Sequence, residues 1–107
     1  MEQIDCTIIG GGIIGLLIGR AVKLAWPHLE VAIFEQEKFA GEHSTTRNSG
    51  VLHAGIYYPT GSLKHQLCLR GNKLWRELQK TLPLEINPCG KYLISTCAAE
   101  EEELLNY

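Results

Sequence analysis

The sequence has no Cys-x-x-Cys pair, no cluster of basic residues and no apolar stretch long enough to cross a membrane. Its four cysteines are widely spaced, which argues against a zinc or thioredoxin-type site. Its four histidines show no metal-ligand pattern, so no metal site is expected. The net charge is −2 and the basic residues are scattered, so no nucleic-acid partner is expected.

The sequence also has few features of a secreted protein. The first apolar run, from Ile8 to Gly19, is preceded by Glu2 and Asp5, where a signal peptide would carry basic residues. Cysteines without a disulfide-like spacing favour a reducing compartment. The expected location is therefore cytoplasmic, and peripheral attachment to the inner face of a membrane is left open.

A short apolar segment followed by closely spaced glycines is the main motif. Residues 4–9 are apolar at most positions, which predicts a parallel strand buried on both faces. Gly10, Gly12 and Gly15 then form a Gly-x-Gly-x-x-Gly pattern at the start of a largely buried helix predicted over 13–26. Such a turn lets a diphosphate approach the backbone, where helix N–H groups and the helix dipole favour an anion. The motif predicts a dinucleotide site.

Glu35 strengthens this prediction. It ends a second predicted strand, over 31–34, and follows Gly15 by 20 residues, the spacing of an acid that binds the ribose. A carboxylate would repel a 2′-phosphate, so an unphosphorylated ribose is favoured. Two alternatives stay open: a glycine-rich turn in another α/β protein, with Glu35 at a solvated strand end, and an NAD-dependent dehydrogenase with the same Rossmann start.

The remaining pattern predicts an α/β fold in which this Rossmann-like βαβ start, with parallel strands, is followed by an amphipathic helix and a further strand. Ser62 is expected to cap that helix, Pro83 to end it, and Gly71 to mark a close backbone approach. Residues 91–96 predict the further strand, and 98–107 a helix with a solvated acidic start. The apolar stripe of the amphipathic helix is predicted at Leu63, Leu67, Leu74, Trp75, Leu78 and Leu82.

Small core positions are expected at Cys6 and Cys68, and surface positions at His28 and His65.

The polar segment 41–50, rich in hydroxyl groups and bounded by glycines, predicts an extended loop or a short helix. Its hydroxyls and amides could line an anion-binding concavity, with Arg47 pairing with a phosphate or carboxylate; a solvated loop is an equal alternative. His53 follows in an apolar segment. It is either a core histidine or a base that takes a hydroxyl proton during hydride transfer, with His43 a candidate for the same site.

These residues resemble the FAD-dependent oxidoreductases of the D-amino-acid-oxidase superfamily, and within it the L-2-hydroxyglutarate dehydrogenases and oxidases. The resemblance covers essentially the whole chain. Its most specific part is the block from Arg47 to Tyr58, and the glycine motif is the least specific. Ser44 and Thr46 depart from the longer polar residue and the glycine expected in that loop, which puts the local backbone shape in question. Further matching segments are Gly61-Ser62-Leu63-Lys64, Leu67-Cys68, Gly71-Asn72 and Cys89-Gly90-Lys91.

The resemblance implies FAD as cofactor and a small 2-hydroxy acid as substrate: L-2-hydroxyglutarate oxidised to 2-oxoglutarate by hydride transfer to the flavin, with a quinone or oxygen as electron acceptor. It implies a catalytic role for His53. The candidate cofactor-binding residues are Gly10, Gly12, Ile13, Ile14, Gly15, Glu35, Gln36, Ser44, Thr45, Thr46, Arg47, Asn48, Ser49 and Gly50.

Members of this superfamily are several times longer. Residues 1–107 are therefore expected to form the N-terminal FAD/NAD(P)-binding portion of such an enzyme, an incomplete domain that lacks the substrate domain and is inactive alone. The remaining polypeptide of a split enzyme is a candidate partner. The alternatives are a glycerol-3-phosphate or amino-acid oxidising flavoenzyme of the same superfamily, and a non-catalytic, truncated nucleotide-binding remnant.

Overall fold

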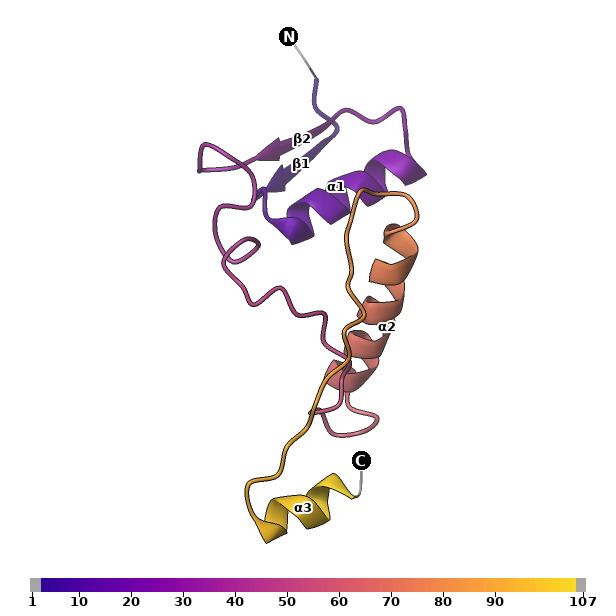
Figure 1. Ribbon diagram of the computed structural model, residues 1–107. Coiled ribbons are helices and arrows are strands. Elements are labelled where there is room, and N and C mark those ends of the chain that lie inside the picture. Colours follow the sequence, from indigo (N-terminus) through magenta and orange to yellow (C-terminus); the bar gives the residue numbers. More distant parts are fainter. Residues whose placement is uncertain (1–2, 106–107) are drawn as a thin grey trace. The chain divides into compact units, whose positions relative to one another are not determined.

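The computed structural model describes residues 3–105 and contains two strands and three helices within them. In chain order these are β1 (Cys6–Ile9), α1 (Ile13–Ala25), β2 (Val31–Phe34), α2 (Leu63–Leu78) and α3 (Ala98–Leu104) (Figure 1). The chain divides into two compact units, one ending at Val51 and the other beginning at Leu52. The predicted α/β fold with a βαβ start is confirmed, and all of that start lies in the first unit.

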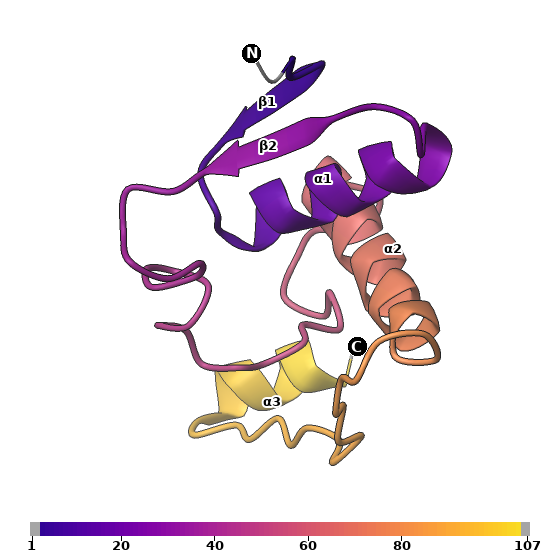
Figure 2. The ribbon, with the colours of Figure 1, turned by 90° about the horizontal axis from the view of Figure 1, so that it is seen from above.

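The first unit is built on a parallel pair of strands. Cys6 of β1 lies opposite Val31 of β2, and Ile9 lies opposite Phe34. The amino ends of the two strands are joined by the amide of Glu30, which donates to the Asp5 carboxylate at 2.8 Å. Because the strands are parallel and in register, their carboxyl ends lie at the same edge, next to the N-terminus of α1 (Figure 2).

Two glycines let α1 lie close to the strands, and both are buried. A Cβ atom at Gly15 would collide with the carbonyl oxygen of Gly10, and one at Gly19 would lie 3.0 Å from Cδ1 of Ile33. Gly15 thus has the role of the third glycine of the motif, which allows close helix–sheet packing. Gly19 repeats this role one helical turn later, and its i, i+4 spacing from Gly15 is the signal that indicates it.

β1 and α1 are less buried than predicted. Residues along β1 alternate between half-buried and exposed, and Gly15 and Gly19 are the buried residues of α1. The side chains of Ile14 and Leu24 are 73% and 64% exposed. Within the first unit α1 is the one helix, so it covers one face of the sheet and turns its own opposite face to solvent.

In the second unit, Ser62 caps α2 as predicted: its hydroxyl accepts a hydrogen bond from the amide of His65 at 3.2 Å. The predicted apolar stripe is wrong at Leu63, Leu67 and Leu74, which are exposed, whereas its other members, Trp75, Leu78 and Leu82, are half-buried. The face of α2 with half-buried residues is rotated from it and holds His65, Cys68, Asn72, Trp75 and Leu78.

The backbone just before α2 explains this rotation. The carbonyl oxygen of His53 accepts hydrogen bonds from Cys68 and Asn72, each at 3.3 Å. Gly55 lies against the same face, beside His65. His65 is therefore half-buried, not at the surface as predicted, whereas His28 is exposed as predicted. The expected core positions Cys6 and Cys68 are only half-buried.

Two further expectations need correction. The space beside Gly71 is open to at least 4 Å, so this glycine marks no close backbone approach and is a tolerated one. Residues 91–96 form no strand, because no segment of the described chain pairs with them. Tyr92 and Ile94 there are 93% and 82% exposed. For residues 41–50 the loop alternative is the right one, because they form consecutive turns and no helix.

The acidic run begins α3, as expected. The amide and hydroxyl of Thr96 donate to the Glu100 carboxylate at 2.7 and 2.8 Å, and these bonds lower the pKa of Glu100. The predicted helix end at Tyr107 lies outside the described residues. Across residues 3–105, no helix has the length and apolarity needed to span a membrane.

The packing of α1 predicts that Gly15→Ala destabilises the chain. The added methyl group meets the backbone of Gly10, which cannot rotate away as a side chain can. We expect a loss of about 1–3 kcal/mol in the free energy of unfolding, measured by urea denaturation followed by circular dichroism. Gly71→Ala is the matched helical control; it meets open space and should stabilise α2 by up to about 1 kcal/mol. Equal effects of the two substitutions would contradict this account of Gly15.

Candidate dinucleotide-binding site

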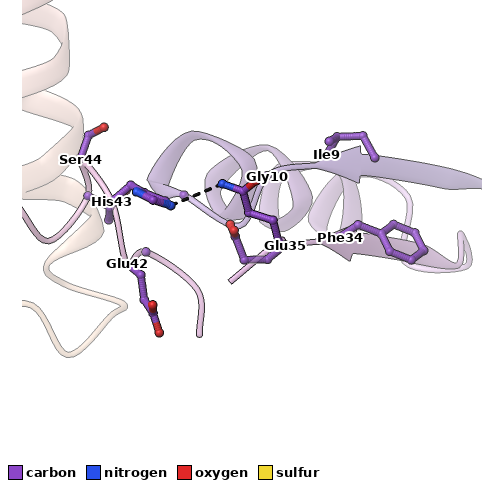
Figure 3. A pocket seen from close by; sticks show the side chains of 11 residues that line it. Ile9, Gly10, Phe34, Glu35, Glu42, His43 and Ser44 are labelled. Carbon is purple, nitrogen blue, oxygen red and sulfur yellow. Dashed lines mark hydrogen bonds between the residues drawn. The ribbon is translucent and has the colours of Figure 1, made fainter. Parts of the chain in front are cut away.

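A cavity of about 290 Å³ opens at the carboxyl ends of β1 and β2. Ligands of open α/β sheets bind at this edge, next to the N-terminus of the helix that follows the first strand. Figure 3 shows Gly10 and Glu35 on one side of the cavity and Glu42, His43 and Ser44 on the other. The lining residues are Ile9, Gly10, Gly12, Phe34, Glu35, Gln36, Gly41, Glu42, His43, Ser44 and Thr45.

Glu35 ties the end of β2 to the glycine turn. One carboxylate oxygen accepts the amide of Gly11 at 2.7 Å, and the other accepts the amide of Glu37 at 3.0 Å. These bonds, led by the one from Glu37, lower the pKa of Glu35 below its ordinary value, with a smaller contribution from the charge of His43. Each oxygen keeps a second acceptor position, so the carboxylate can also bind two ribose hydroxyls.

The N-terminus of α1 has an unusual cap. The N-cap residue is Gly12, which has no side chain to accept a helix amide. Thr45 supplies the acceptor from the distant loop: its hydroxyl takes the amide of Ile13 at 2.9 Å. In the described chain, the amides of Ile14 and Gly15 meet no acceptor. These two N–H groups are the orphan donors that an anion would satisfy.

The glycine turn has the shape that the motif predicts. Gly10 has a φ of +102°, a conformation that L side chains rarely adopt. A Cβ atom at Gly11 would lie 3.1 Å from the Glu35 side chain, and one at Gly12 would lie 3.3 Å from the Thr45 hydroxyl. A side chain at either position would fill the space where a ligand approaches the backbone.

His43 links the two walls of the cavity. Its Nε2 atom is 2.9 Å from a carboxylate oxygen of Glu37 and 3.4 Å from the side-chain amide nitrogen of Gln36. Its carbonyl oxygen accepts the amides of Thr46 and Arg47, at 3.1 and 3.0 Å. His43 therefore holds the turn that follows Gly41 against the segment that follows β2.

The second half of the polar loop is held by its own side chains. The Thr46 hydroxyl donates to the carbonyl of Gly41 at 2.8 Å. Asn48 donates to the carbonyls of Ser44 and Thr45, and its own oxygen accepts the amide of Gly50 at 2.8 Å. Of the predicted cofactor-binding residues, the cavity lining does not include Ile13, Ile14, Gly15, Thr46, Arg47, Asn48, Ser49 or Gly50.

His53 belongs to the second unit, where its backbone carbonyl is bonded to α2 and its side chain is exposed. It is therefore not a core histidine. Its proposed role as a base stays a prediction. His43 lines the cavity of the first unit, and its predicted place in one site with His53 stays a prediction.

Several lining residues were missed in the sequence. Ile9 and Phe34 are the last residues of the paired strands, and their register brings them to the same edge. Gly41 has a φ of +83° and is buried against the side chains of Thr45 and Thr46. Gly41 could have been found from the sequence, because it is the glycine that begins the polar loop. No sequence pattern indicated Glu42.

The residues present fit a dinucleotide. Two orphan amides at a helix N-terminus suit a phosphate, a side-chain-free turn admits it, and an ionised carboxylate with spare acceptor positions suits a ribose. The cavity volume is at the lower end of the range for small-molecule sites, so it suits part of a dinucleotide and not the whole of one.

Comparison with known proteins supports this interpretation. The family model described as FAD dependent oxidoreductase matches residues 5–107. The chain is 42% identical over 103 residues to the human mitochondrial L-2-hydroxyglutarate dehydrogenase. The aligned residues are 96% of this chain and 22% of that protein. It is 40% identical over 100 residues to L-2-hydroxyglutarate dehydrogenase of Escherichia coli K12, covering 94% of this chain and 24% of that protein. A Dictyostelium discoideum mitochondrial relative of the same name is 39% identical over 100 residues, covering 94% and 22%. The chain thus spans less than a quarter of the length of these relatives.

The hydroxyl of Thr45 is expected to stabilise the start of α1. Thr45→Val keeps the side-chain shape but leaves the amide of Ile13 without its acceptor. A lost helix cap costs about 1 kcal/mol, so hydrogen exchange at the Ile13 amide should become about fivefold faster in NMR measurements. Thr45→Ser retains the hydroxyl and serves as the control. An unchanged exchange rate in the valine variant would show that this bond contributes nothing.

The lowered pKa of Glu35 sets the direction of a pH effect. Its hydrogen-bonded carboxylate contributes stability that is fully present above the ordinary glutamate pKa and is lost as pH falls through the lower pKa of the folded state. The difference in unfolding free energy between the wild type and Glu35→Gln should therefore shrink on acidification from about pH 6 to about pH 3. Glu77→Gln, on α2, is the control, because its carboxylate makes no hydrogen bond to a described residue. A difference that stays constant with pH would refute the assignment.

Proposed function

Because this chain belongs to the family of FAD-dependent oxidoreductases, we propose that its cavity binds the adenosine diphosphate part of FAD. We further propose that the chain serves an enzyme that oxidises L-2-hydroxyglutarate to 2-oxoglutarate, the substrate named in its relatives. The observation that carries the proposal is the convergence of the glycine turn, the α1 N-terminus and the Glu35 carboxylate on one cavity.

The contacts suggest a division of the cofactor among these residues. Gly10 and Gly12 leave room for the diphosphate, and the orphan amides of Ile14 and Gly15 face it, next to the Ile13 amide that Thr45 caps. Glu35 binds the ribose hydroxyls, with Gln36, Ser44 and Thr45 beside it. The loop that continues through Thr46, Arg47, Asn48, Ser49 and Gly50 is proposed to follow the cofactor toward the flavin, with the exposed Arg47 guanidinium available for a phosphate.

When bound, FAD supplies a two-electron acceptor for the hydride that leaves a substrate carbon. The carbonyl of 2-oxoglutarate forms only if the substrate hydroxyl also loses its proton. We propose that the exposed imidazole of His53 takes this proton in its neutral form. The hydrogen bonds from Cys68 and Asn72 to the His53 carbonyl hold the backbone at this position and so fix the direction of its Cα–Cβ bond. A quinone or oxygen is the proposed final electron acceptor.

The exposed apolar surface supports a further polypeptide as partner. No hydrophobic side chain among the described residues is buried, and more than three quarters of each relative's length lies outside the match. We propose that polypeptide corresponding to the unmatched part covers this surface and supplies the substrate pocket. The cytoplasmic or membrane-peripheral location stays a prediction, because the relatives include mitochondrial and bacterial proteins.

The cofactor is tested by mixing the purified chain with FAD and measuring the visible flavin absorbance that stays with the protein through gel filtration. We expect retention of FAD and none of NAD. Glu35→Gln should weaken FAD binding about tenfold through the lost charge-assisted bonds to the ribose, while Glu77→Gln should leave it unchanged. Retention of NAD instead of FAD would favour the dehydrogenase alternative.

The substrate is tested on the full-length product purified from its source cells. Under anaerobic conditions, L-2-hydroxyglutarate is expected to bleach the flavin absorbance. Bleaching by glycerol 3-phosphate or an amino acid instead would identify a sibling enzyme of the same superfamily. A product that binds FAD but is bleached by none of these would favour the non-catalytic alternative.

A further inference from the structure

Among the described residues, the lining of the cavity holds no fixed positive charge to balance the diphosphate proposed to occupy it. Two carboxylates, of Glu35 and Glu42, line the cavity, and that of Glu37 lies just behind it, 2.9 Å from His43. No lysine or arginine is among the lining residues of the described chain. A diphosphate brings two further negative charges. The one lining side chain that can become positive is the imidazole of His43.

The contacts of His43 show where a proton would be gained. A carboxylate only accepts hydrogen bonds, so the Nε2 atom that faces Glu37 at 2.9 Å must carry a hydrogen. The Gln36 amide at 3.4 Å then presents its oxygen to this N–H once its nitrogen and oxygen positions are exchanged. Nε2 is thus occupied in the neutral ring, and Nδ1, for which the described chain offers no partner, is the atom that takes up a proton.

The surroundings of the ring favour the charged form once an anion arrives. The imidazole is 55% exposed, so its protonation needs no burial of charge. From the segment after β2 it faces Glu37 and Gln36, with Glu35 close enough to interact through its charge. Its neighbour in the chain is Glu42, which also lines the cavity. The lining residues next to β1 and α1 are Gly10 and Gly12, which carry no charge. A bound diphosphate adds to the negative potential that these acids create.

We propose that binding of FAD to this cavity takes up a proton at His43, which makes His43 a positioning residue for the diphosphate half of the cofactor. This inference rests on the proposed FAD site. A bound state that holds more protons is favoured as pH falls, so affinity should rise through the histidine range. Between about pH 8 and about pH 5.5 we expect FAD to bind about fivefold to tenfold more tightly.

The test is calorimetric titration of the full 107-residue chain with FAD at several pH values, in buffers that differ in ionisation heat. The dependence of the measured heat on the buffer reports the protons taken up. His43→Gln keeps an N–H donor for Glu37 but cannot become charged. His28→Gln removes an exposed histidine that does not line the cavity and serves as the matched control. Circular dichroism checks that each variant is folded.

Proton uptake in the wild type and in His28→Gln, with none in His43→Gln, would support the proposal. FAD binding whose affinity is independent of pH, or equal uptake in all three proteins, would overturn it and leave the proposed cofactor intact. No FAD binding at any pH would overturn both proposals. Should His43→Gln fail to fold, NMR titration of the wild-type imidazole decides, because FAD must then raise its pKa.

Discussion

The first unit depends on the close contact between α1 and the strand pair, which is possible because α1 has no side chain at Gly15 and Gly19. The backbone of the helix rests against Gly10, and Ile33 packs where a side chain at Gly19 would be. This contact places the helix N-terminus beside the carboxyl ends of both strands. A helix held farther away would leave its orphan amides remote from Glu35, which would separate the proposed phosphate donors from the proposed ribose acceptor.

Once this geometry is set, two side chains from later in the chain complete it. Glu35 accepts the Gly11 amide and so holds the end of β2 against the glycine turn, while Thr45 caps α1 from the polar loop. His43 then connects the loop to the segment after β2 through Glu37. The same few atoms therefore stabilise the turn and shape the cavity, so the proposed ligand would bind to groups that also hold the first unit together.

The exposed leucines and isoleucines have a consistent physical interpretation. A two-stranded sheet with one covering helix can bury little apolar surface, and this chain matches less than a quarter of its relatives. Leu63, Leu67 and Leu74 fall on one predicted stripe of α2, but the described chain packs other residues of that helix. These leucines are therefore part of the surface that the proposed further polypeptide would cover.

The sequence by itself determined the local features of this protein. Glycine spacing, strand composition and the N-cap at Ser62 each depend on nearby residues. For this reason the βαβ start, the first residues of α1 and α2, and the position of Glu35 at the end of β2 were predictable. The tertiary structure alone decided which side of α2 is covered, that residues 91–96 lack a strand partner, and that His43, Glu42, Ile9 and Phe34 meet at one cavity. Those outcomes depend on contacts between residues distant in the chain, and local periodicity holds no information about which distant group occupies a given face.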